Sequence, residues 1–238
     1  MSFWLRTNPV SAARHFDHRF QLFVNNVLCG VSKPVGKIVD FKYRIEFQQR
    51  GSPHAHMVIW VKEASPITKQ TTEQVKKFVE IYVTCALPED QDDLRSTVET
   101  VQMHTHSVAC KKSGKQCITV GFPLPAMENT TVYLPIVSSP PESLTKVYED
   151  ILHTVQTNVN DIQLNSSVQL RDSLDKLEIN MDTYLQAIRW LKTKNGQPAV
   201  LIQRKPAENR INIYNANLLS AWKANMDIPF ITTDKQLQ

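Results

Sequence analysis

The stretch of residues 41–61, FKYRIEFQQRGSPHAHMVIWV, constrains the fold more than any other part of the sequence. In its first half, apolar residues alternate with charged or polar ones, a period of two that is typical of a half-buried strand. The residues GSP at 51–53 interrupt this pattern, and a second run, HAHMVIWV, follows at once. We therefore predict two neighbouring antiparallel strands joined by a turn at residues 51–53.

Two histidines stand in the second of these runs. His54 and His56 are two positions apart, so both project from the same face of a strand, about 7 Å apart along the backbone. Glu46 has the matching parity on the first strand. Two imidazoles and a carboxylate form a nitrogen and oxygen donor set that suits a divalent ion such as Mn²⁺ or Mg²⁺. A His-x-His pair taken alone is also compatible with a structural or incidental role.

The overall composition is that of a globular chain. With 238 residues, 42% of them hydrophobic and 21% charged, the sequence can bury the core of one large domain or two small ones. The net charge of +4 permits a nucleic-acid partner without requiring one. No apolar run reaches the roughly 18 residues of a membrane span, and none suits a signal peptide. We therefore expect a soluble intracellular protein with no membrane partner, located in the nucleus if it acts on DNA.

Further helices and strands are predicted from capping residues and apolar spacing. Asn8 as N-cap and Pro9 at the first helical position open a helix that runs to Leu28. A second helix is expected at residues 71–85. The remaining predictions are helices at residues 94–103, 165–179, 184–191 and 217–224, and strands at residues 199–203 and 227–231.

A second group of metal-binding residue types lies downstream: Cys85, His104, His106, Cys110 and Cys117. Thiolates and imidazoles are the ligands of tetrahedral zinc sites, and a zinc ion would stabilise the polar loop KKSGKQ between the last two cysteines. The spacing matches none of the common zinc-finger patterns. On the residues alone, reduced cysteines and solvent-exposed histidines remain an equal alternative.

Several segments resemble the Rep nuclease domain of Helitron rolling-circle transposons. EFQQRGSPHAHMVIW is similar to the histidine motif of that family, and NPVSAARHFDHRF to the segment just upstream of it. GFPLP, and RKPAE followed by IYNANLL and WKANMDI, are similar to later segments. The resemblance implies an α+β, relaxase-like HUH fold, with a central antiparallel sheet, covering helices and a Cys/His zinc-binding-like insert.

The same resemblance implies ligands and partners. It implies a catalytic Mn²⁺ or Mg²⁺ held by Glu46, His54 and His56, and a structural Zn²⁺ held by four of the five Cys and His residues, most simply without His104. Single-stranded DNA is the implied substrate, and a helicase domain of a full-length element is a further expected partner. We expect DNA contacts from four residues: Gln48, Arg50, Arg204 and Lys205. For the last two, a solvated pair is the alternative.

The resemblance also suggests how the chain is divided. Residues 1–84 would hold the N-terminal helix and the metal-binding strand pair, and residues 85–135 the Cys/His-rich segment. Residues 136–238 would hold a helical insert and the C-terminal part of the Rep-like domain, ending before its catalytic tyrosine helix.

The nucleophile is the point at which the sequence departs from the family. Family members carry one or two tyrosines on a helix soon after the last strand, and these attack a DNA phosphodiester. Here Phe230 is followed by ITTDKQLQ, and no tyrosine falls in the matching position. The leading hypothesis is a truncated domain that binds metal and single-stranded DNA but does not cleave by itself. The alternatives are an active nuclease, in which Tyr43 or Tyr214 substitutes or another segment or chain completes the site, and a metal-stabilised interaction module without DNA activity.

Overall fold

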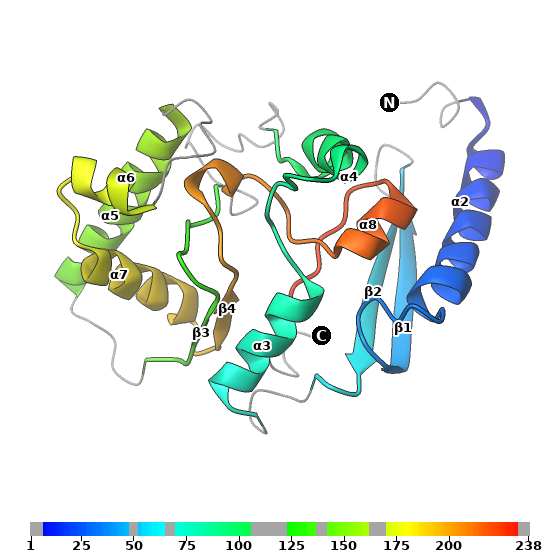
Figure 1. Cartoon of the computed structure of the whole chain (residues 1–238), viewed down its shortest axis with the longest axis horizontal. Coiled ribbons are helices and arrows are strands. Elements are labelled where there is room, and N and C mark those ends of the chain that lie inside the picture. The colour runs from blue at the N-terminus through cyan, green and yellow to red at the C-terminus, as the bar shows by residue number, and fades with distance from the viewer. Residues whose placement is uncertain are drawn as a thin grey trace.

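The computed structural model describes residues 7–47, 52–64, 70–105, 123–136, 142–161 and 170–232. Within these ranges the chain forms seven α-helices and two separate two-stranded antiparallel sheets (Figure 1). The predicted α+β class is therefore confirmed.

The first sheet is the hairpin of β1 (Ile38–Phe47) and β2 (Pro53–Val61), which confirms the predicted strand pair. One face of the hairpin carries Met57 and Ile59, which pack against a buried cluster that includes Leu28. The opposite face is largely open to solvent. Among the residues that the structure describes, the apolar packing of the hairpin on the rest of the protein therefore comes from one side.

Helix α2 (Pro9–Phe23) lies along the hairpin and continues into a π-helical turn at Val24–Leu28 (Figure 1). Phe20 is buried, with its ring centroid 5.0 Å from that of Tyr43 on β1 and 6.2 Å from that of Trp222. Aromatic contacts of this kind add to the free energy gained by burying the rings. They join the N-terminal helix, the hairpin and a helix from near the end of the chain.

The middle of the molecule is built from four helical elements: α3 (Thr72–Tyr82), α4 (Asp92–Thr97), a π-helical turn (Val98–Gln102) and α8 (Ala216–Trp222). Asn215 links three segments here, because its Nδ2 atom donates to the carbonyl oxygens of Pro34 and Tyr82 at 2.8 and 2.6 Å. Its Oδ1 atom accepts from the backbone N–H of Leu218 at 3.0 Å. Asn215 is buried, so these bonds are shielded from water and fix the loop before β1 to the start of α8.

The other end of the molecule contains α5 (Glu142–Asp161), α6 (Leu170–Lys176), α7 (Met181–Thr193), β3 (Thr131–Tyr133), β4 (Ala199–Leu201) and a 3-10 turn (Pro206–Glu208). The helices and strands of this group share a second core around Tyr184 and Ile188 of α7. Figure 1 places this group opposite the hairpin. None of the described helices is both long and apolar enough to cross a membrane.

Two predictions about strands were wrong. The described residues contain no central sheet, because β3 and β4 pair only with each other. Residues 227–231 belong to no strand: Ile228 packs into the cluster beside the hairpin, while Phe230 packs on Phe78 of α3, with ring centroids 5.9 Å apart. The alternation of apolar residues in this segment reflects packing into two different cores, which produces the same sequence pattern as a strand.

Candidate functional site

The exposed face of the hairpin brings the predicted metal ligands together. Glu46 lies directly across the ladder from His54, and Arg44 lies directly across from His56. The Nε2 atom of His56 is 3.1 Å from the Oε2 atom of Glu46, and the rings of the two histidines are 5.7 Å apart between centroids. The strand register alone accounts for this grouping, because directly opposed residues have Cβ atoms about 5 Å apart.

The electrostatics of this group are those of a solvated surface. About half of each side chain is exposed, 56% for His56 and 50% for Glu46. Arg44 also approaches Glu46, with Nη2 and Oε2 3.6 Å apart. Arg44 and His56 therefore share the carboxylate of Glu46. In the described part of the chain, no three His, Cys, Asp or Glu side chains are already close enough to hold one ion. The side chains of Glu46 and His56 are in contact, and the ring of His54 lies next to that of His56.

The donor set nevertheless suits a divalent ion. His54 and His56 are exposed, and exposed side chains change rotamer on the picosecond to nanosecond timescale. A turn of the His54 ring therefore requires no movement of the strand. Two imidazoles and a carboxylate on one face, open to solvent, leave coordination positions for other oxygen ligands.

The same face carries five further residues that sequence reasoning missed: Asp40, Lys42 and Arg44 on β1, and Val58 and Trp60 on β2. Beyond the histidines, Lys42 faces Val58 and Asp40 faces Trp60 across the ladder. Lys42 is exposed, and 38% of the surface of Trp60 is accessible to solvent. Their parity is the same as that of His54, so the alternation that identified the histidines also identifies Lys42, Arg44 and Trp60. We call this set, with Glu46, His54 and His56, the histidine face.

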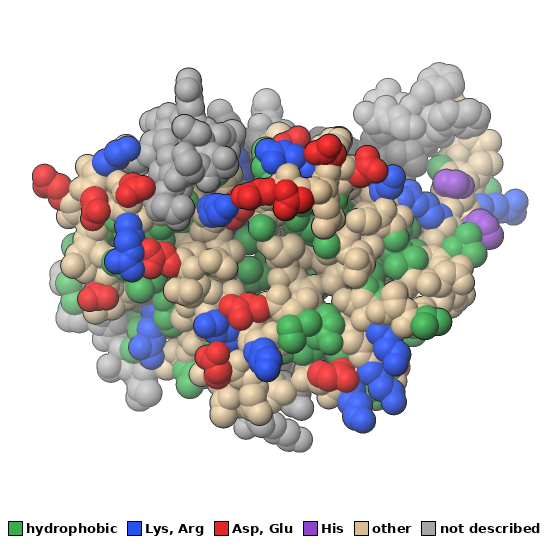
Figure 2. Space-filling view, in the orientation of Figure 1, with side chains coloured by type: hydrophobic (Ala, Val, Ile, Leu, Met, Phe, Trp, Pro, Cys, Tyr) green, Lys and Arg blue, Asp and Glu red, His purple; other side chains and the backbone are tan. Residues whose placement is uncertain are grey.

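The histidine face carries side chains of the types that contact nucleic acids. Lys42 and Arg44 offer positive charge to phosphates, and an exposed indole offers a surface on which a base can stack. Along β2 the distance from His54 to Trp60 is about 20 Å, at roughly 3.4 Å per residue. In the view of Figure 2, basic and acidic side chains are mixed over most of the molecule, with one group of Lys and Arg side chains at the lower right.

No tyrosine lies on the histidine face. All six tyrosines of the sequence fall within the described residues. Tyr43 has the opposite parity on β1, where its hydroxyl accepts a hydrogen bond from Nε2 of Gln21 at 2.8 Å. Tyr214 is buried, its hydroxyl donates to the carbonyl oxygen of Ala86 at 2.6 Å, and burial raises its pKa to about 12. Neither hydroxyl is therefore placed beside the histidines, which disfavours the alternative that Tyr43 or Tyr214 serves as the nucleophile.

Arg204 is not a surface residue, which corrects the prediction that it contacts DNA. It is 3% exposed, and its Nη1 atom donates to the carbonyl oxygens of Glu208 and Ile211 at 2.5 and 2.7 Å. The neighbouring Lys205 is exposed, with its Nζ atom 3.2 Å from Oε1 of Glu89. Gln48 and Arg50, the other two expected DNA contacts, lie outside the described residues.

The zinc prediction falls mostly outside the described residues, since His106, Cys110 and Cys117 lie there. Cys85 is fully buried in a cluster of apolar residues, and its Sγ atom donates to the carbonyl oxygen of Gln203 at 3.2 Å. Burial raises the pKa of this thiol to about 11. A buried, protonated thiol is a core residue rather than a ready metal ligand, because metals bind the thiolate. His104 is joined through its backbone N–H to the carbonyl oxygen of Arg210.

The described chain is thus an α+β protein whose distinctive surface is a hairpin with a His-x-His pair and a facing carboxylate. The family model described as "Helitron helicase-like domain at N-terminus" matches residues 4–59. This range includes α2, β1 and the histidines of β2, so the resemblance is confirmed over the segment that carries the candidate ligands. Comparisons with curated proteins and with solved structures found no match.

Proposed function

We propose that this protein binds single-stranded DNA and a divalent metal ion on the histidine face, as the histidine-bearing strand pair of a relaxase-like Rep domain. The observation that carries the proposal is the strand register, which groups His54, His56 and Glu46 on one open face. The match of residues 4–59 to the Helitron helicase-like model supports a Helitron-related role for this segment.

The proposed metal would be held by Glu46, His54 and His56. When bound, a divalent ion in such a site polarises a phosphodiester oxygen. The residues of the chain contribute the rest: Oε2 of Glu46 lies 3.1 Å from Nε2 of His56, which brings two of the proposed ligands together, and Arg44 adds positive charge beside the site. Lys42 and Trp60 lie further along the same face, where a strand of DNA that reaches the histidines would pass.

We further propose that these residues alone do not cut DNA. Covalent cleavage needs a nucleophile within reach of the polarised phosphate, and none of the six tyrosines is on this face. A loss of covalent catalysis typically costs several orders of magnitude in rate. Binding without cleavage is therefore the expected activity, unless another segment or chain supplies a tyrosine.

Metal binding is tested by titrating Mn²⁺ into the protein and measuring free Mn²⁺ by electron paramagnetic resonance. The double variant His54→Ala, His56→Ala is expected to lose one binding site. The matched control is His15→Ala, His18→Ala, which removes two exposed histidines from α2 and leaves the hairpin unchanged. Equal Mn²⁺ binding by all three proteins would refute the proposed site.

DNA binding and cleavage are tested together with a fluorescently labelled oligonucleotide. Binding is expected to weaken with salt, and Lys42→Ala combined with Arg44→Ala should weaken it severalfold at low salt. A denaturing gel run after incubation with Mn²⁺ should show no covalent adduct. An adduct of one protein mass, abolished by a single tyrosine substitution, would show that the chain does hold a working nucleophile.

A further inference from the structure

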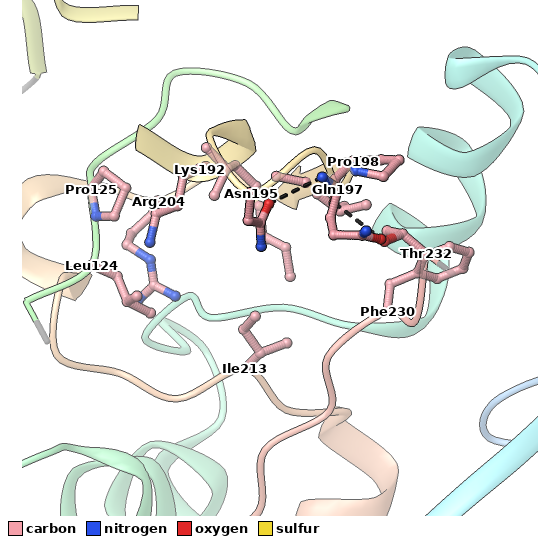
Figure 3. Close-up of a pocket in the computed structure, with 14 residues that line it drawn as sticks. Leu124, Pro125, Lys192, Asn195, Gln197, Pro198, Arg204, Ile213, Phe230 and Thr232 are labelled. Atoms are coloured by element: carbon pink, nitrogen blue, oxygen red, sulfur yellow. Dashed lines mark hydrogen bonds between the residues drawn. The ribbon is translucent and has the colours of Figure 1, made fainter. Parts of the chain in front are cut away.

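A cavity of about 290 Å³ lies between the end of α7, strand β4 and residues 230–232 (Figure 3). Apolar side chains form much of its wall, among them Leu124, Ile213 and Phe230. Its volume is near the lower limit of small-molecule sites in proteins, roughly 300 Å³. In Figure 1, α7 lies toward the end of the molecule opposite the hairpin and β4 lies nearer the middle. No hairpin residue is among the described residues that line the cavity, so it is separate from the histidine face.

Two cations line the cavity, and no carboxylate appears among its described lining residues. Figure 3 shows Lys192, from α7, and Arg204, from the segment after β4, side by side at one end of it. Burial and the positive charge of Arg204 both lower the pKa of Lys192. The positive charges of Lys192 and Arg204 repel each other, and this repulsion is stronger where the groups are partly shielded from water. An anion bound between them would therefore be stabilised.

The nearby acidic groups do not occupy this position. Glu208 and Asp227 both interact electrostatically with Arg204, but neither lines the cavity. The carboxylate of Glu208 instead accepts hydrogen bonds from the backbone N–H groups of Leu87 and Lys205, at 3.1 and 2.8 Å. The described lining of the cavity therefore holds two cations and no carboxylate to balance them.

The polar groups of the cavity are held in place before any ligand arrives. Both of the hydrogen bonds that Arg204 donates to backbone carbonyls within the described ranges come from Nη1, and they fix the guanidinium. Asn195 is held in a turn, because its Oδ1 atom accepts from the backbone N–H of Gln197 at 3.0 Å. Gly196 between them has a φ of 74°, a left-handed conformation that favours glycine. Figure 3 shows the Asn195 amide directed toward the interior of the cavity.

We propose that this cavity binds a phosphate monoester of mononucleotide size, with the phosphate between Lys192 and Arg204 and a flat ring against the apolar wall at Phe230. Two cations match the double charge of a phosphate monoester, and an arginine fork suits its oxygens. The apolar wall and the small volume favour one ring system rather than a longer chain. The proposal does not depend on the function of the histidine face.

The test is isothermal titration calorimetry of the full chain with three probes: inorganic phosphate, adenosine monophosphate and adenosine. We expect adenosine monophosphate to bind at least tenfold more tightly than either of the others. No measurable binding of adenosine monophosphate at millimolar concentration would overturn the proposal. So would equal affinity for inorganic phosphate, because the apolar wall would then contribute nothing. Comparing oligonucleotides with and without a 5′-phosphate then distinguishes a strand end from a free nucleotide as the source of the phosphate.

Lysine variants locate the site. Lys192→Met should weaken binding of adenosine monophosphate by about tenfold or more, since a charge-assisted hydrogen bond contributes roughly 1.5 to 3 kcal/mol. Lys192→Arg should retain most of the affinity. The matched control is Lys194→Met, two residues further on, where the lysine is exposed and lies 3.5 Å from Glu149. Thermal melting of each variant shows that it is folded, and equal loss of affinity in the Lys192→Met and Lys194→Met variants would overturn the assignment.

Discussion

Arg204 offers the sharpest test of how this chain is stabilised, because the sequence places it on the surface and the structure places it in the core. In Arg204→Met, the apolar stem remains but the guanidinium is lost. The carbonyl oxygens of Glu208 and Ile211 then lose their donor inside the protein. Hydrogen bonds from a charged group contribute about 1.5 to 3 kcal/mol each, so the gross loss is about 3 to 6 kcal/mol.

Part of that loss is recovered, because the variant no longer buries a cation. Burial lowers the pKa of Arg204, which shows that the charged form carries a desolvation cost in the folded protein. We therefore expect a net decrease of about 3 kcal/mol in the free energy of unfolding. The control is Lys205→Ala, which breaks only an exposed ion pair with Glu89 and should change stability by less than about 1 kcal/mol.

Urea unfolding, followed by circular dichroism, measures both variants against the unmodified chain, and the midpoints give the differences in stability at a constant m value. The argument fails if Arg204→Met unfolds at the same urea concentration as the unmodified chain while its affinity for single-stranded DNA falls. That result would show that Arg204 contacts DNA at the surface, as expected from the sequence.

Three other variants test single contacts. Asn215→Ala should lower the free energy of unfolding by about 3 kcal/mol, since two buried carbonyl oxygens lose their donor, and urea unfolding measures this. Tyr43→Phe should leave Mn²⁺ and DNA binding unchanged, because its hydroxyl lies on the packed face; a loss of either would contradict the register. Cys85 has an ordinary pKa of 9.0 that burial raises to about 11, so the unfolded chain loses this proton first. Stability should therefore fall as pH rises from 9 to 11, by at most about 1.4 kcal/mol per pH unit, with a shallower decline in Cys85→Ala.

The hairpin and its faces were predictable because their signals are local. A period of two assigns every residue of a strand to one face, and the break in the sequence pattern at residues 51–53 separates the two strands. The start of α2 was equally local: Asn8 accepts from the backbone N–H of Ser11 at 3.2 Å, as its place before Pro9 predicts. Helix α5 was missed, although its apolar residues recur at helical spacing from Leu144 to Val155.

The roles of Arg204 and Cys85 were not predictable from sequence, since both depend on contacts between distant segments. The Sγ atom of Cys85 donates to Gln203, which is 118 positions away. The side chain of Arg204 bonds to residues nearby in sequence, but its surroundings come from distant segments: its backbone pairs with Met127, and Lys192 of α7 lies beside its guanidinium. Cysteine is a common zinc ligand and arginine is a common phosphate ligand. Residue type alone does not distinguish such a binding residue from a buried residue with a structural role.

The arrangement of the hairpin separates residues that stabilise it from residues that can bind. An isolated two-stranded hairpin is marginally stable in water, so this one depends on its packed face. Phe20 of α2 and Met57 of β2 contribute to that packing, while the contacts of His54 and His56 within the described part of the chain are with each other and with Glu46 on the hairpin. Substitutions on the histidine face should therefore cost little stability, because exposed positions away from special contacts usually change it by less than about 0.5 kcal/mol. The residues on the histidine face can therefore suit a ligand without a large effect on the free energy of unfolding.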